Sequence, residues 1–197
     1  MPLPRLYIIR HGNTDWSETH RFTGRTDLPL NARGEQNARL LAARLKGLTF
    51  ARVFTSPLQR ARKTCELAGF ASAAEPDPDL LEWDYGQFEG CHSTNIYREK
   101  PDWELFRDGA PGGESTQQIA ARADRFINKV RQITGDVAAF TSGHICRVIA
   151  ARWIGQSTGL GGSLLCSTAS ISILGYEHGL NDPAFHLWND DGTIPRP

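Results

Sequence analysis

The sequence predicts an α/β fold, a three-layer αβα sandwich with a mainly parallel central sheet. Short apolar runs alternate along the chain with longer segments of helical period, which is the pattern of repeated β-α units. Polar, glycine-containing segments directly follow several of these runs, as in open α/β sheets, which bind ligands at the carboxyl ends of their strands. The length of 197 residues, 40% of them hydrophobic, fits a single domain spanning residues 1–197.

In the N-terminal half, the first strand is expected at residues 6–9 and a polar loop at 13–30. A helix follows, with Asn31 as its N-cap and Gly47 at its end. Its buried face is predicted to contain Ala38, Leu41, Ala42 and Leu45. The second strand is expected at residues 53–55, after which Ser56 caps a helix that has Pro57 at its first position.

In the C-terminal half, residues 80–113 show no clean period and are rich in Trp, Gly and Asp, so this stretch is expected to be a long excursion that covers the site. Ser115 and Gln118 form a capping box that opens a long helix. The core face of that helix is predicted to be Ile119, Ala123, Phe126, Ile127 and Val130. A strand at 137–141, a helix carrying Ile145, Val148 and Ile149, a flexible loop at 159–162, and strands at 170–174 and 185–188 complete the prediction.

The composition excludes several classes of partner. The 22 Lys and Arg residues balance 22 Asp and Glu residues, so the net charge supports neither a nucleic-acid nor a membrane-surface partner. No run approaches the roughly 18 apolar residues of a membrane span, and the N-terminus lacks the apolar core of a signal peptide. The cysteines lie far apart, without a C-x-x-C pair, which indicates free thiols in a reducing, cytoplasmic compartment; they are Cys65, Cys91, Cys146 and Cys166.

Arg10-His11-Gly12, directly after the first apolar run, is the most informative segment. An imidazole can act as a nucleophile, and an adjacent guanidinium can bind a phosphate group bidentately. Gly12 lets the backbone turn and approach closely. The segment therefore favours phosphoryl transfer onto His11, although such a tripeptide also arises by chance.

Three other positions in the sequence are consistent with phosphoryl transfer onto His11. Arg60 lies near the start of the helix after the second strand, where the N-terminus favours an anion; the alternative is a surface salt bridge. Glu82 is followed by Trp83 and lies close to Tyr85, which would desolvate the carboxyl group and raise its pKa, as a general acid requires; the alternative is a solvated loop carboxylate. His144 follows the strand at 137–141 and could meet His11 across the sheet edge; the alternative is a helix-capping segment.

At this point the chain resembles the histidine phosphatase superfamily, which includes the cofactor-dependent phosphoglycerate mutases. The resemblance covers nearly the whole chain. It is carried by Arg10-His11-Gly12-Asn13-Thr14-Asp15-Trp16, Thr23-Gly24-Arg25-Thr26-Asp27-Leu28-Pro29-Leu30, Arg33-Gly34-Glu35-Gln36-Asn37-Ala38, Ser56-Pro57-Leu58-Gln59-Arg60-Ala61-Arg62-Lys63-Thr64, Glu82-Trp83-Asp84-Tyr85-Gly86, Gly112-Gly113-Glu114-Ser115 and Arg147-Val148-Ile149-Ala150-Ala151-Arg152-Trp153.

The resemblance implies a phosphohistidine mechanism that needs no metal and no cofactor. His11 would attack phosphorus in line, while Arg10 and Arg60 bind the equatorial oxygens. Glu82 would donate a proton to the leaving oxygen and later activate water. In the family, residues at the positions of Asn13, Ser17, Thr23 and Gly24 line the phosphate and substrate pocket. Tyr85 lies near Glu82, the expected general acid.

One position departs from the family pattern. Counting back from Arg147, Ser142 stands where the family has its second catalytic histidine. Three explanations remain open: an engineered substitution that slows turnover, a natural change with weakened or altered activity, or a local shift that lets His144 serve because residues 142 and 144 share a strand face.

The nearest resemblance is to sugar-phosphate phosphatases, including the sedoheptulose bisphosphatase-like branch. The expected function is a phosphomonoesterase acting on a small phosphorylated metabolite. A phosphoglycerate mutase is the first alternative, although the segment after Glu82 is acidic and Arg98 and Lys100 are expected at the surface. A phospho-ligand-binding protein of low activity is the second, supported by Ser142. His20, His92, His178 and His186 are interpreted as structural, and the sequence leaves a homo-oligomer open.

Overall fold

In the computed structural model, which describes residues 3–193, six strands form one sheet in the order β3-β2-β4-β1-β5-β6. The strands are β1 (Leu6–Arg10), β2 (Arg52–Thr55), β3 (Ala74–Pro76), β4 (Val137–Thr141), β5 (Ile171–Tyr176) and β6 (Pro183–Asp190). The pairs β1–β4, β2–β4 and β2–β3 are parallel, whereas β5 pairs antiparallel with both β1 and β6. The mainly parallel sheet is therefore confirmed, with an antiparallel edge.

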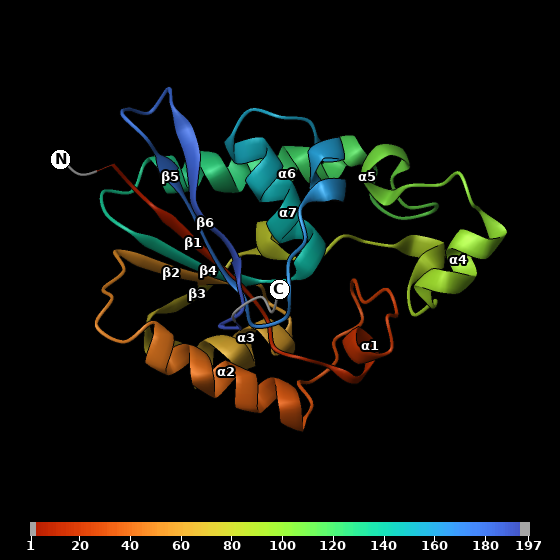
Figure 1. The fold of residues 1–197 in the computed structure, drawn as a ribbon, viewed down its shortest axis with the longest axis horizontal. Coiled ribbons are helices and arrows are strands. Elements are labelled where there is room, and N and C mark those ends of the chain that lie inside the picture. Colours follow the sequence, from red (N-terminus) through yellow and green to blue (C-terminus); the bar gives the residue numbers. More distant parts are fainter. Residues whose placement is uncertain (1–2, 194–197) are drawn as a thin grey trace.

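Helices cover both faces of this sheet (Figure 1). One layer contains α2 (Ala32–Arg44) and α3 (Gln59–Leu67), and the other contains α6 (Thr116–Arg131) and α7 (Gly143–Trp153). Successive side chains of β1 point to opposite faces of the sheet and so pack in two different cores. Leu6 and Ile8 pack in the cluster with α6 and α7, and Tyr7 and Ile9 pack in the cluster with α2. The three-layer αβα sandwich is confirmed.

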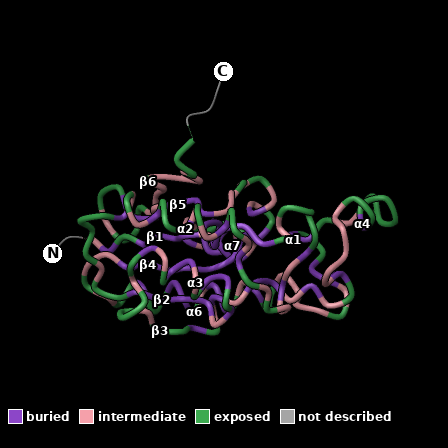
Figure 2. Tube along the Cα trace, turned by 90° about the horizontal axis from the view of Figure 1, so that it is seen from below, coloured by how far each residue is buried: buried purple, intermediate pink, exposed green. Residues whose placement is uncertain are grey.

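The short helices α1 (Asp15–Glu18), α4 (Ser93–Glu99) and α5 (Leu105–Asp108) lie beyond the carboxyl ends of the parallel strands. Single turns of 3-10 helix occur at 71–73, 78–80 and 86–88, and a longer one at 158–163. The tube in Figure 2 shows α4 largely exposed, far from the buried sheet. The stretch at 80–113, predicted as an excursion, contains α4, α5 and the 3-10 turn at 86–88. The expectation of a flexible loop at 159–162 was wrong, because a 3-10 helix spans residues 158–163.

Local signals at two helix starts are confirmed. The Asn31 side chain accepts a hydrogen bond from the Gly34 N–H at 2.9 Å, and Ser115 and Gln118 form the predicted capping box. The predicted face of α6 is fully buried. Gly47 (φ +83°) lies in the turn after α2, which ends at Arg44.

The predicted start of α3 was wrong. The helix begins at Gln59, with Leu58 at its cap position and no side-chain cap from its own segment. Instead the Oδ1 atom of Asp27, distant in sequence, accepts the Gln59 N–H at 2.7 Å. This tertiary contact satisfies a donor that Ser56 was expected to satisfy. The three-residue edge strand β3 was also missed, because so short a segment shows no periodicity.

Across residues 3–193, no helix is both long enough and apolar enough to cross a membrane. All four cysteines are free thiols, as predicted.

Candidate active site

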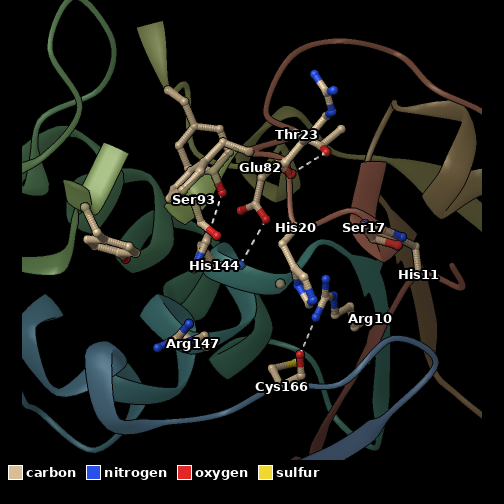
Figure 3. A pocket seen from close by; sticks show the side chains of 15 residues that line it. Arg10, His11, Ser17, His20, Thr23, Glu82, Ser93, His144, Arg147 and Cys166 are labelled. Atoms are coloured by element: carbon tan, nitrogen blue, oxygen red, sulfur yellow. Dashed lines mark hydrogen bonds between the residues drawn. The ribbon is translucent and has the colours of Figure 1, made fainter. Parts of the chain in front are cut away.

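A cavity of about 340 Å³ opens at the carboxyl end of β1 and β4, where the sheet meets α7, α4, α1 and the loop between α1 and α2 (Figure 3). It brings together seven of the predicted residues: Arg10, His11, Ser17, Thr23, Glu82, Tyr85 and His144. The rest of its wall is formed by His20, Arg21, Phe22, Ser93, Tyr97, Gly143, Arg147 and Cys166. The wall thus contains three arginines (Arg10, Arg21 and Arg147) and one carboxylate (Glu82), and this excess of positive charge favours an anionic ligand.

His11 is held rigidly as a neutral imidazole. Its backbone N–H donates to the Thr141 carbonyl at 2.9 Å, and its own carbonyl accepts from Ala169 N–H at 3.0 Å. Burial, together with the nearby charges of Arg60 and Arg10, lowers the pKa of His11 well below its ordinary value. Nδ1 donates to the Gly12 carbonyl at 2.7 Å, which leaves the Nε2 lone pair available at the cavity.

Gly12 is required by close packing. A Cβ atom here would lie 2.3 Å from the Gly34 carbonyl oxygen at the start of α2. The Gly12 N–H donates to Thr64 Oγ1 on α3 at 3.0 Å. The backbone after His11 is therefore wedged between two helices, which explains why the tripeptide contains glycine at this point.

The Arg10 guanidinium lies against the first residue of α7. A Cβ on Gly143 would approach its Cζ and Nε atoms at 3.0 Å, and Nη1 donates to the Cys166 carbonyl. The Nε atom is buried without a hydrogen-bond partner within residues 3–193. Arg10 also lines the cavity, and a guanidinium in a cavity wall suits an incoming oxyanion.

Arg60 is fully buried and lies outside the cavity wall. Nη1 donates to the Thr26 carbonyl at 2.8 Å, and Nη2 donates to the carbonyls of Gly24 at 2.8 Å and Thr23 at 3.1 Å. These bonds fasten the loop that carries Thr23. Its Nε finds no acceptor in the described part of the chain, and its charge lowers the pKa of His11. The contact of Arg60 with phosphate oxygens stays a prediction.

The predicted environment of Glu82 was wrong. Its Oε1 accepts the N–H groups of Trp83 and Ile145, and its Oε2 accepts that of His144, each at 2.9 Å. Burial raises the carboxyl pKa, but the neighbouring His144 and the backbone donors outweigh burial, and the pKa of Glu82 lies below its ordinary value. Glu82 is therefore ionised in the unliganded protein rather than held protonated by Trp83 and Tyr85.

Ser142 and His144 do not share a strand face, because β4 ends at Thr141 and α7 begins at Gly143. Ser142 occupies the N-cap position, yet its buried Oγ makes no hydrogen bond within residues 3–193. Its side chain is not part of the cavity wall.

His144 lies in the cavity wall with His11, as predicted. Its Nδ1 is hydrogen-bonded to the Tyr85 hydroxyl, and its ring stacks on Phe22 with centroids 5.9 Å apart. Burial lowers the pKa of His144 to about 4. The imidazole is therefore neutral near pH 7 and supplies no positive charge in place of the residue missing at position 142.

The other predicted pocket residues either line the cavity or hold the loops around it in place. Ser17 Oγ accepts from the Thr14 N–H at 2.9 Å and so orders α1, and Thr23 Oγ1 donates to the Arg21 carbonyl at 3.1 Å. Gly24 lies behind the wall, where its N–H donates to Glu89 Oε1 at 2.9 Å. Asn13 Oδ1 accepts from Asn37 and Thr168 at 3.1 and 3.0 Å, so this side chain cross-links the loops around the site.

His20 was interpreted as structural but lies in the cavity wall, with a left-handed backbone (φ +53°). An isolated bridge between Arg21 and His92 brings its loop beside α4, which contributes Ser93 and Tyr97. Arg147 and Cys166 were also missed as wall residues. No local sequence signal marks any of these positions, because the contacts join segments far apart in the chain.

The family profile of the histidine phosphatase superfamily (branch 1) matches residues 6–191. The chain belongs to this superfamily. It is 37% identical over 185 residues to an acid phosphatase of Mycobacterium tuberculosis, covering 91% of this chain and 90% of that protein. It is 32% identical over 239 aligned positions to sedoheptulose 1,7-bisphosphatase of Saccharomyces cerevisiae, covering 97% and 86%.

The fold agrees with this assignment. The solved structure of the Rv3214 open reading frame product of Mycobacterium tuberculosis superposes with a TM-score of 0.86 at 34% identity, covering 94% of this chain and 96% of that one. Membership of the superfamily and the relatives together point to a phosphatase enzyme.

Proposed function

We propose that this protein is a metal-independent phosphomonoesterase that hydrolyses a small phosphorylated metabolite, in particular a sugar phosphate, through a phosphohistidine on His11. The observation that carries the proposal is the neutral, oriented His11 imidazole beside the Arg10 guanidinium in the wall of one cavity. A nucleophilic lone pair and an oxyanion donor at one end of a cavity are the two elements that phosphoryl transfer requires.

In the first step, His11 Nε2 donates its lone pair to phosphorus, and the bond between phosphorus and the ester oxygen breaks. The pinned Nδ1–H disperses the positive charge that develops on the ring toward the Gly12 carbonyl. Arg10 and the buried charge of Arg60 stabilise the negative charge on the phosphoryl oxygens. These side chains supply the charge that a metal ion provides in other phosphatases.

The leaving oxygen must receive a proton. A bound phosphate dianion would place negative charge next to the Glu82 carboxylate and raise its pKa, so that Glu82 takes up a proton as substrate binds and then donates it to the leaving oxygen. Oε2 accepts one backbone bond where Oε1 accepts two, so Oε2 retains the better lone pair for that proton. In the second step, water loses a proton to Glu82 and attacks phosphorus, which releases inorganic phosphate and regenerates His11.

The size and lining of the cavity favour a compact substrate. About 340 Å³ falls at the lower end of the range for small-molecule sites. Ser93 and Tyr97 add hydroxyl groups and Phe22 adds an aromatic ring to the wall, which suits a polyol backbone. The names of the relatives, an acid phosphatase and a sedoheptulose 1,7-bisphosphatase, also support this substrate class.

The test is inorganic phosphate release from sugar phosphates, phosphoglycerates and p-nitrophenyl phosphate in excess EDTA, with His11→Ala as control. We expect release that persists in EDTA and disappears in the variant. Interconversion of phosphoglycerates without net phosphate release would instead favour the mutase. Release that His11→Ala retains, or that EDTA abolishes, would refute the mechanism.

Ser142 favours a second candidate, a phospho-ligand-binding protein of low activity. The Ser142 side chain is short and neutral, and its buried Oγ has no hydrogen-bond partner among the described residues, so it cannot replace a cationic phosphate ligand. Loss of such a ligand costs on the order of 2–4 kcal/mol of transition-state stabilisation, or roughly 30- to 1000-fold in rate.

If the protein is an enzyme with weakened activity, Ser142→His should raise kcat for its best substrate by a factor in that range, measured by phosphate release. Ser142→Ala is the control and should leave kcat nearly unchanged, because the hydroxyl makes no hydrogen bond to any residue in the range 3–193. Binding of a phosphate ester by wild type, with no turnover in either wild type or Ser142→His, would favour the binding protein.

A further inference from the structure

His20 has a left-handed backbone (φ +53°) just after α1, at a point where a helix end usually has glycine. Two hydrogen bonds hold this conformation. The His20 carbonyl accepts the Ser93 N–H at 3.0 Å, and the next residue, Arg21, donates its N–H to the Trp16 carbonyl at 2.9 Å. A residue with a Cβ is strained in this region, and such strain concentrates at functional sites. The strain therefore points to a role for the His20 side chain.

The imidazole of His20 points into the cavity. In Figure 3, the ring extends from its loop toward the end of the cavity where Arg10 lies. Within residues 3–193, neither ring nitrogen makes a hydrogen bond, and no carboxylate lies within 4.0 Å of the ring. By contrast, Nδ1 of His92 lies 2.9 Å from Thr94 Oγ1, and Nδ1 of His144 is hydrogen-bonded to a tyrosine hydroxyl. The His20 ring is thus available to a ligand.

The proposed phosphoryl site lacks a cationic donor. Ser142 stands where the superfamily has its second catalytic histidine, and its neutral side chain is not part of the cavity wall. His144 does not supply the charge, because burial lowers its pKa to about 4. A protonated imidazole donates a hydrogen bond from each nitrogen, and a bound phosphate dianion stabilises its positive charge. A histidine that enters the cavity from another segment can therefore restore the missing contact.

We propose that His20 contacts the transferring phosphoryl group and stabilises its charge, in place of the histidine that is absent at position 142. The inference rests on the proposed function and adds a catalytic residue to it. His20 reaches the cavity from the loop after α1, whereas position 142 follows the carboxyl end of β4. The strain at His20 then has a physical reason, because glycine fits the backbone better but offers no side-chain donor.

The first test replaces His20 by asparagine, which tolerates a left-handed backbone but carries no charge. We expect His20→Asn to lower kcat about 10- to 100-fold, the effect of one charge-assisted hydrogen bond, measured by phosphate release in excess EDTA. The fall should be equal for p-nitrophenyl phosphate and a sugar phosphate, because the two esters share the phosphoryl group. A fall limited to the sugar phosphate, or a change below about threefold with both esters, would overturn the proposal and leave the phosphatase function intact.

A second variant separates catalysis from folding. His20→Gly relieves the backbone strain, so Tm should stay equal or rise by roughly 2–4 °C while kcat falls as in His20→Asn. A fall in kcat accompanied by a fall in Tm would mark a structural role and refute the proposal. His92→Asn is the matched control, because His92 lies opposite Arg21 in the bridge beside α4 but outside the cavity wall. Its kcat should equal that of wild type.

Combining His20→Asn with Ser142→His tests whether the two positions serve the same purpose. In the Ser142→His background, His20→Asn should lower kcat less than about threefold, compared with about 10- to 100-fold in the wild-type background. The same fold-loss in both backgrounds would show that the two positions act independently, and would refute the replacement of one histidine by the other.

If wild type hydrolyses none of the esters, the phosphatase proposal fails, and calorimetric binding of inorganic phosphate decides the His20 contact separately. A Kd raised at least about tenfold by His20→Asn, and not by His92→Asn, supports the contact. Equal or undetectable binding in all three proteins refutes it.

Discussion

Replacing Glu82 by glutamine tests the central acidic group of the site. In the native protein, three backbone N–H groups converge on this carboxylate, those of Trp83 and Ile145 on Oε1 and that of His144 on Oε2, all at 2.9 Å. Glutamine offers one oxygen and turns an NH₂ group toward the remaining N–H. The variant Glu82→Gln therefore loses at least one charge-assisted bond and weakens the others.

The expected loss of stability is about 3 kcal/mol, since hydrogen bonds to charged groups contribute about 1.5–3 kcal/mol each. For a chain of this size, that corresponds to a fall in Tm of roughly 6–12 °C, measured by differential scanning calorimetry near pH 7. Glu75→Gln is the matched control, because Glu75 makes an exposed ion pair with Arg52, worth less than about 1 kcal/mol. An equal Tm in the two variants would contradict the argument.

The same variant separates the catalytic role of Glu82 from its structural one. If Glu82 protonates the leaving oxygen, Glu82→Gln should lower kcat for a sugar phosphate about 10²- to 10⁴-fold. The fall should be much smaller with p-nitrophenyl phosphate, whose nitrophenolate leaves without a proton. Equal falls for both substrates would show that Glu82 positions α7 and does not transfer a proton.

Two further predictions follow from the site. The pKa of His144 in the folded protein is about 4, below its ordinary value of 6.5. As pH falls from 6.5 toward 4, the unfolded chain therefore binds a proton at this residue before the folded protein does. About 3 kcal/mol of folding stability is lost over this range. Urea unfolding at pH 7.5, 5.5 and 4.5 should show this decline, with a shallower slope in His144→Asn; an equal slope would refute it. Gly12→Ala should lower stability by more than about 2 kcal/mol and abolish turnover, because its Cβ would meet the Gly34 carbonyl at 2.3 Å. Gly179→Ala, where nothing lies within 4 Å of a Cβ, is the control, and equal stability losses in the two variants would contradict the packing argument.

Much of the fold follows from signals that act over a few residues. The alternation in β1, the buried face of α6 and the caps Asn31 and Ser115 depend on local periodicity and local hydrogen bonds, and the structure confirms them. The placement of His11, Arg10 and His144 at one cavity follows for a related reason. Arg10 ends β1, His11 follows it, and His144 stands three residues after the end of β4. The two strands are adjacent and parallel, so their carboxyl ends meet.

The sequence by itself thus determined the αβα architecture, the superfamily and the position of the proposed nucleophile. The tertiary structure decided the electrostatic state of the site. The N–H groups of His144 and Ile145, some sixty residues away, keep Glu82 ionised, and the carbonyls of Thr23, Gly24 and Thr26 engage Arg60. Periodicity records which face of a segment is buried, whereas pKa and charge pairing depend on distances between atoms that only folding brings together.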